Sequence, residues 1–440
     1  MLQLSSEEVI QLAPDAASVS AARGLSSPAK WVLLGQDDEA VWGECKGSGA
    51  KPYQVQVDVQ GPAFKCSCPS RKFPCKHGLA LLLMRAQDAS RFTDARPAWV
   101  DEWLDGRRQR AEKAEAKRQA PSEAVADPQA AAKREAARLE RMAAGLQDLE
   151  VWMADQVRQG LIQLTQQPEV WDTQARRLVD NQLPGLAEPL RRIGALVGQG
   201  EDWPRRVLTE FGRLSLMVAA FARREQLPAL VWEDLRTALG WPQEKTAALQ
   251  GDVLEDEWLV LGESAEENQQ IWTRRLWLQG HATGRVALLV DHAHGSRVFA
   301  ESFVVGQKLA LRLGFYPSHH PLRAQLVERG MGAAGGVPVA PSLAASLEAL
   351  SAHGAAQPWR SLHPLVLAGV QLVFHVEHWL AVGDGVQWGL DLPRAQGLAL
   401  LARSGGAPLT LMGEWNGRQL LPLSAWQDEL IWTRNLEQAP

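Results

Sequence analysis

The sequence predicts an α+β protein of several domains: a small β-meander with a helix, then a helical bundle, then a β-rich α+β domain. Three patterns predict this order. Cysteine and histidine side chains are compressed into residues 66–77, apolar residues recur every three or four positions from about Leu139, and short apolar segments separated by glycine-bearing turns begin at about Glu257. A chain of 440 residues has room for several such domains.

Residues 1–105 are expected to form the small module, with its core at about 30–87. In the last strand expected before the cluster, valines alternate with polar residues, which is the period-two pattern of a half-buried strand. An apolar run after the histidine of the cluster is typical of a helix. Strands are therefore expected at Lys30–Gly35, Ala40–Cys45 and Pro52–Val59, followed by a helix at Gly78–Arg85.

Cys66, Cys68, Cys75 and His77 give the most specific chemical signal in the chain, a C-x-C-x6-C-x-H spacing. Thiolate and imidazole groups bind Zn²⁺ at about 2.0 to 2.3 Å, and four of them complete a tetrahedron. A disulfide framework fits less well, because only 4 cysteines occur in 440 residues and no secretory signal is recognisable. Buried free thiols would leave the clustering unexplained. We therefore predict one Zn²⁺ per chain.

The predicted zinc is structural rather than catalytic. Three cysteines and one histidine fill the tetrahedron and leave no open position for water or substrate. The expected helix begins beside Cys75, where its free amides favour a thiolate. Cys45 lies outside the ligand pattern; it is either a spare ligand or, as we expect, a small apolar residue packed on a strand.

At these residues the chain resembles the SWIM zinc-finger family, whose pattern is C-x-C, a variable gap and C-x-H. All four residues match that pattern position by position, after strands and before a helix. The segments Trp42–Ser48 and Pro52–Tyr53 look like those of bacterial members. This resemblance covers about residues 30–87 and implies a zinc-binding module for DNA or protein contacts.

The segment Ala175–Ala187 is similar to the helical region of long bacterial SWIM proteins. Such proteins are often encoded near AAA+ ATPases and von Willebrand A-type proteins. The resemblance therefore implies, by association, a protein partner of one of these two classes.

The segment that carries the predicted zinc ligands has a positive charge balance in a chain whose net charge is -5. Residues 61–96 carry seven basic and two acidic side chains, and Lys65, Arg71, Lys72 and Lys76 would contact phosphates if nucleic acid binds. The same side chains would also stabilise a zinc centre that three thiolates make negative, without nucleic acid. The sequence leaves both interpretations open. Base readout is disfavoured, because no row of polar residues follows a recognition helix.

Residues 106–138 are expected to be a charged, Ala-rich linker that is partly helical. Residues 139–250 are expected to form a helical bundle, in which one helix continues from Leu139 until Pro168 stops it. A further helix is expected to open at Asp202, with Asp as the N-cap and proline in the first turn.

Residues 251–440 are expected to form a β-rich domain of unknown function, with some helix near Ser342–Ser351 and one strand over residues 366–382. The run Gly330–Gly335 satisfies G-x-G-x-x-G, but prolines follow where a helix should open, so a flexible loop is expected. In the expected strand His375 would share a face with Glu377 but not with His378, which does not suit a metal.

Three function classes follow from these patterns. The first is a non-catalytic interaction protein in which the zinc module and the large body hold a protein partner. The second is a nucleic-acid binder, and the third is an enzyme in the C-terminal half, although the sequence has no P-loop, G-x-S-x-G or H-E-x-x-H motif. No apolar run reaches the length of a membrane span, so a cytoplasmic protein is expected.

Overall fold

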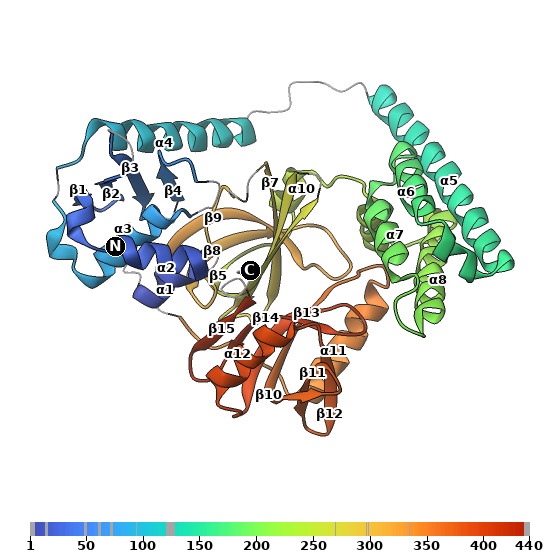
Figure 1. The fold of residues 1–440 in the computed structure, drawn as a ribbon. Coiled ribbons are helices and arrows are strands. Elements are labelled where there is room, and N and C mark those ends of the chain that lie inside the picture. Colours follow the sequence, from blue (N-terminus) through green and yellow to red (C-terminus); the bar gives the residue numbers. More distant parts are fainter. Residues whose placement is uncertain are drawn as a thin grey trace.

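The computed structural model of the chain describes residues 5–13, 16–47, 51–59, 63–70, 74–93, 95–119, 128–268, 270–295, 297, 299–333 and 335–434. In Figure 1 the N-terminal module (blue) and the helical bundle (green) lie on opposite sides of a central β-barrel, and the C-terminal sheet (orange and red) lies below the barrel. The predicted α+β class and its order along the chain are confirmed. Among the described residues, no helix is both long and apolar enough to span a membrane.

The N-terminal module is a four-stranded antiparallel meander, in sequence order, with α3 packed against one face. Val55 and Val57 of β3 point into the same core as Leu79 and Leu83 of α3, which explains the valine alternation in the sequence. Two short helices before the sheet pack on α3 and were not predicted. The elements are α1 (Ser6–Gln11), α2 (Ala16–Leu25), β1 (Trp31–Gln36), β2 (Ala40–Cys45), β3 (Tyr53–Asp58), β4 (Ala63–Cys66) and α3 (Lys76–Gln87).

A long helix, α4 (Ala98–Gln119), follows the module. Its first turns pack on the module, because Val100, Trp103 and Leu104 share a small apolar core with Trp42 of β2. Arg107 of α4 also forms an ion pair with Asp58 of β3 at 3.2 Å. These contacts fix the start of α4 on the meander.

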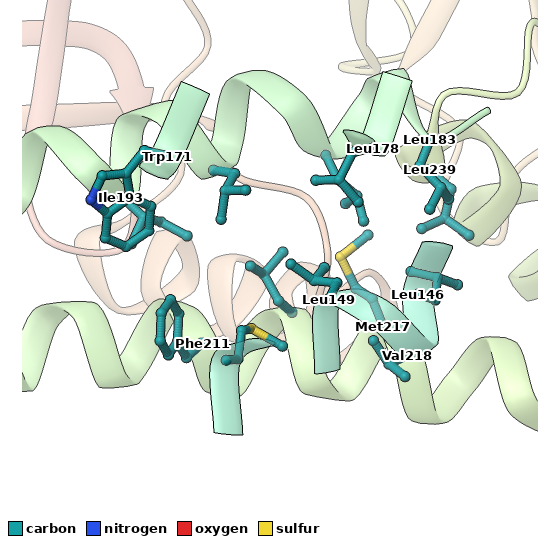
Figure 2. Close-up of a cluster of buried hydrophobic side chains, with 14 of the residues drawn as sticks. Leu146, Leu149, Trp171, Leu178, Leu183, Ile193, Phe211, Met217, Val218 and Leu239 are labelled. Carbon is teal, nitrogen blue, oxygen red and sulfur yellow. The ribbon is translucent and has the colours of Figure 1, made fainter. Parts of the chain in front are cut away.

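The bundle has one continuous core of apolar side chains from its helices, and Figure 2 shows part of it, with Trp171 and Phe211 near one end and Leu183 and Leu239 near the other. The helix expected to run to Pro168 ends earlier. Gly160 adopts φ 89° there, a left-handed conformation that ends the α-helix, and a short 3₁₀ segment follows. The elements are α5 (Pro128–Gln159), α6 (Glu169–Asp180), α7 (Pro184–Leu196), α8 (Trp203–Ala222), α9 (Ala229–Leu239) and α10 (Lys245–Gln250).

Asp202 occupies the expected N-cap position of α8, with Pro204 in the first turn. Its carboxylate makes no capping hydrogen bond and instead lies near Arg206 at 3.5 Å and near Arg418 of the C-terminal sheet at 3.4 Å. The predicted helix start is therefore confirmed, while the side chain serves as an ion-pair partner.

Two glycines of the bundle give a matched test of its packing. A Cβ at Gly185 of α7 would lie 2.2 Å from the carbonyl oxygen of Ala238 in α9, so Gly185→Ala has to push two backbones apart. We expect this substitution to destabilise the bundle by about 1–3 kcal/mol. Gly212 of α8 has nothing within 4 Å of the same position. Gly212→Ala should instead stabilise the bundle by about 1 kcal/mol through helix propensity.

Urea unfolding of the two glycine variants, monitored by far-ultraviolet circular dichroism, measures the change in the free energy of unfolding of each variant relative to the unsubstituted chain. Equal changes in the two variants would contradict the close approach of α7 and α9.

The central barrel closes with the strand order β5-β6-β7-β9-β8. Its one parallel contact joins β7 to β9 through Leu288 and Arg323, and the other neighbours are antiparallel. This is the topology of the OB-fold barrels, which are five-stranded Greek keys. The elements are β5 (Val253–Asn268), β6 (Ile271–Gly280), β7 (Val286–His294), β8 (Lys308–Phe315) and β9 (Arg323–Ala333).

The C-terminal sheet has six strands in the order β12-β11-β10-β13-β14-β15. Trp379, Trp388 and Trp432 lie in its main core. The helix expected near Ser342–Ser351 is confirmed as α11. The elements are α11 (Leu343–Ala356), β10 (His363–His375), β11 (His378–Gly383), β12 (Val386–Leu390), α12 (Arg394–Ser404), β13 (Leu409–Trp415), β14 (Leu420–Trp426) and β15 (Leu430–Thr433).

Two local predictions for the C-terminal half are wrong. The single strand expected over residues 366–382 is a hairpin, because Val376 and Glu377 adopt φ 43° and 66° and reverse the chain. His375 and His378 consequently face each other as a cross-strand pair. The loop expected at Gly330–Gly335 begins inside β9, because Gly332 pairs with Leu309 of β8.

A buried charge joins the barrel to the C-terminal sheet. Glu414 of β13 is fully buried and accepts hydrogen bonds from Arg275 Nε at 2.8 Å and from Trp277 Nε1 at 2.8 Å, both on β6. Burial alone would lower the pKa of Arg275, but the hydrogen bond and charge of Glu414 outweigh it and raise that pKa. Arg275 therefore stays protonated inside a largely apolar interface.

Candidate metal centre

Strand β4, helix α3 and the loop between them position the four predicted ligands. Cys66 ends β4, Cys68 lies two residues further in the loop, Cys75 is the N-cap residue of α3, and His77 lies in its first turn. One ligand atom from each of them can be chosen so that all four lie within 4.8 Å of one another. The Nδ1 atom of His77 lies 3.9 Å from the sulfurs of both Cys66 and Cys75. These separations suit a tetrahedron around one ion, so the residues are positioned to bind one zinc ion.

Contacts of the residues next to the four ligands hold this geometry. Ser67, between the first two cysteines, accepts a hydrogen bond from the amide of Gln54 and donates its own amide to the Gln54 carbonyl, at 2.9 and 3.0 Å. The Tyr53 ring lies against His77, with ring centroids 5.1 Å apart. Gly78 is required beside the histidine, because a Cβ there would lie 2.8 Å from the Phe64 ring. The strand end, the loop and the helix start are thus tied together.

Burial and hydrogen bonding shift the pKa values of the three thiols in different directions. A hydrogen bond from Cys66 lowers the pKa of the Cys75 thiol against the effect of burial, helped by His77 and by the backbone amide of Gly78 at the start of α3. The same contact and burial raise the pKa of Cys66, and burial raises that of Cys68. A bound Zn²⁺ supplies the positive charge that keeps all three sulfurs as thiolates, and it releases their protons on binding.

Cys45 is not part of the centre. It lies on β2, fully buried in the core of the module, and its sulfur contacts the carbonyl oxygen of Lys46 at 3.7 Å. It is not among the four residues whose ligand atoms lie within 4.8 Å of one another. The expectation that Cys45 packs as a small apolar residue agrees with this position.

The seven basic residues of the segment 61–96 have different environments. Arg96 forms ion pairs with Asp37 and Glu39 at 2.5 and 2.9 Å, and Arg91 pairs with Asp88 at 2.7 Å. The guanidinium of Arg85 donates to Gln36 at 2.8 Å. Of the four side chains proposed to contact phosphates, Lys65 on β4 and Lys76 at the start of α3 are exposed, while Arg71 and Lys72 lie outside the described residues.

A hollow next to the centre was missed by the sequence analysis. It has a volume of about 650 Å³ and lies between α2, the end of β2 and the loop that carries Cys68. Lys46 and Lys76 line it together with His77. Its far wall is α2, an element that was not expected. The small residues that α2 contributes, among them Ala17 and Ala21, carry no motif that would have revealed the hollow.

Other potential ligands of the described chain do not assemble in this way. His292 of β7, for example, exchanges a hydrogen bond with Thr273 at 3.0 Å. Among the described residues, the Cys66–His77 cluster is the one place where three or more potential ligand side chains lie close enough together to bind a metal ion.

Two family models match the chain. A SWIM zinc finger matches residues 53–86, and a SWIM-associated four-helix bundle domain matches residues 137–239. The first match contains the whole Cys3His group, and the second spans α5 to α9, including the segment Ala175–Ala187. Both resemblances expected from the sequence are therefore confirmed. No curated protein and no solved structure matches the chain.

Proposed function

We propose that this chain, which carries a SWIM zinc finger and a SWIM-associated helical bundle, is a non-catalytic interaction protein that holds a protein partner. The zinc is structural in this proposal. It folds the loop between β4 and α3 and so shapes the surface of residues 53–86, which we call the finger. The partner contacts are assigned to the finger rather than to a reaction centre.

The proposal rests mainly on the contacts that the basic side chains of residues 61–96 make within the module. Of the seven basic residues in 61–96, Arg85, Arg91 and Arg96 already bind side chains of the same module. A nucleic-acid surface needs cations that face outward in a row and release counterions from phosphates. Here Arg85 joins α3 to β1 and Arg96 joins the β1–β2 turn to Asp101 of α4, so part of the positive charge serves the module itself, which favours a protein partner.

The barrel supports the same proposal. OB-fold barrels that bind oligonucleotides use the outer face of their second and third strands, which correspond to β6 and β7. In this chain Trp277 of β6 and Leu288 of β7 pack instead against Met412, Leu423 and neighbouring residues of the C-terminal sheet. The chain itself covers much of the face that would bind a single strand.

The class of the partner follows only from the resemblance. Long bacterial SWIM proteins are often encoded near AAA+ ATPases and von Willebrand A-type proteins, and we propose a partner from one of these two classes. Nucleic acid is the second candidate, and the exposed Lys65 and Lys76 favour it. An enzymatic role of the C-terminal half is the third candidate, and the sequence of that half has no recognisable catalytic motif.

Two binding measurements on the full zinc-loaded chain separate these candidates. Fluorescence anisotropy with double- and single-stranded DNA and RNA should give dissociation constants no tighter than about 10⁻⁴ M, the weak end of non-specific binding. Co-expression with the AAA+ ATPase or von Willebrand A-type protein encoded nearby should give a stable complex. Tight nucleic-acid binding that weakens linearly with the logarithm of salt, without a protein complex, would overturn the proposal.

A further inference from the structure

The hollow beside the zinc centre has two walls of different character. On one side α2 presents Ala17, Ala21 and Leu25, which form a small apolar surface. On the other side lie the zinc loop and the start of α3. A volume of about 650 Å³ is that of a site for a small ligand or a few side chains.

Gly47, Tyr53 and His77 lie together in the wall of the hollow. A Cβ at Gly47 would lie 2.5 Å from the Tyr53 ring, whose centroid is 5.1 Å from that of His77, so a larger residue at position 47 would press on this contact. A zinc ion held by His77 would therefore also fix this wall of the hollow.

The charges around the hollow have one sign. Lys46, at the end of β2, and Lys76, at the start of α3, both line it, and no carboxylate is among the described residues that line it. The ammonium of Lys46 donates to the carbonyl oxygen of Ala29 at 3.0 Å, which anchors it while leaving further N–H groups to donate. A ligand that fits this site has to combine negative charge with a small apolar group.

We propose that the hollow binds an acidic segment of the partner protein. Carboxylates of that segment contact Lys46 and Lys76, and an apolar side chain next to them packs against Ala17, Ala21 and Leu25. This inference rests on the proposed function and adds to it the place of contact and the chemistry of the partner.

A nucleic acid fits the hollow less well than an acidic peptide. Single-strand sites combine a cationic groove with aromatic faces on which bases stack. The aromatic ring of this hollow, Tyr53, already lies against His77, and the opposite wall is made of small aliphatic side chains. Two lysines on a small hollow also provide no track for successive phosphates.

The test uses the full zinc-loaded chain and a fluorescein-labelled peptide with Gly-Glu-Leu-Glu repeats, with a Gly-Lys-Leu-Lys peptide as its counterpart. We expect the acidic peptide to bind with a dissociation constant of about 10 to 100 μM, typical of a weak contact. The double variant Lys46→Glu/Lys76→Glu should weaken that binding by at least about tenfold and should gain binding of the basic peptide. Zinc content verifies that the variant keeps its centre.

Lys65→Glu is the matched control, because it reverses an exposed lysine of the same module that does not line the hollow. It should leave the dissociation constant of the acidic peptide unchanged within about twofold, apart from a long-range effect that salt screens. Equal loss in Lys65→Glu, or no binding of the acidic peptide to the unsubstituted chain, would refute the site.

Oligothymidine and the partner complex complete the test. Oligothymidine that binds more tightly than the peptide, and is lost in Lys46→Glu/Lys76→Glu, would assign the hollow to nucleic acid and overturn the inference. A double variant that still forms the partner complex at full strength would refute the hollow while leaving the proposed protein interaction intact. Loss of the complex in the double variant but not in Lys65→Glu supports both the hollow as the place of contact and the proposed protein interaction.

Discussion

Cys75→Ser should abolish zinc binding and unfold the finger while the rest of the chain stays folded. Cys75 is the buried N-cap of α3 and the thiol that the cluster most favours as a thiolate, so a hydroxyl in its place removes both a ligand and a charge. Zinc contributes about 10–16 kcal/mol to the folding of zinc-finger peptides, far more than a small module gains from its core. Limited proteolysis should then cut within residues 51–87 and leave the bundle, barrel and C-terminal sheet intact.

Cys45→Ala provides the matched control for this experiment. Cys45 is equally buried in the same module but lies outside the ligand group. Its variant should keep the metal and the protease resistance of the finger. A Cys75→Ser protein as resistant as the Cys45→Ala protein would show that zinc does not hold the finger together.

Glu414→Gln should destabilise the interface between the barrel and the C-terminal sheet by about 1–3 kcal/mol, because Arg275 loses its buried charged partner but keeps its ion pair with the exposed Glu266 at 2.7 Å. The substitution keeps the shape of the side chain but removes the negative charge that faces Arg275. Hydrogen exchange followed by mass spectrometry should show faster exchange in β6, β13 and β14. The finger, which makes none of these contacts, should exchange at its original rate.

Glu267→Gln is the matched control for the interface, because Glu267 is exposed on β5 of the same barrel. A surface change of this kind usually alters stability by less than about 0.5 kcal/mol. Similar exchange in the two variants would mean that the buried pair contributes little to the interface.

The metal centre could be predicted from the sequence because its ligands are local. Cys66 and His77 are eleven positions apart, and the alternation before them and the apolar run after them fix one strand and one helix. The hollow could not be predicted in this way. It depends on α2, which the whole meander separates from α3 in the sequence, and on Lys46, which carries no motif of its own.

The C-terminal half shows the same limit. Short apolar segments between glycine-bearing turns predicted a β-rich domain, but its division into a closed barrel and an open sheet depends on pairings such as Leu288 with Arg323. The turn at Val376–Glu377 lacks the glycine or asparagine that usually marks a left-handed position, so one strand was predicted in place of the hairpin. Glu414 likewise resembles an ordinary strand residue until its partners on β6 are known.

Zinc content is the measurement that tests the account most directly. Mass spectrometry of the intact unsubstituted chain, of Cys45→Ala and of Cys75→Ser should show one zinc, one zinc and none. An unsubstituted chain that is free of metal, yet keeps a protease-resistant finger, would contradict the zinc-folded finger on which the proposed partner contacts depend.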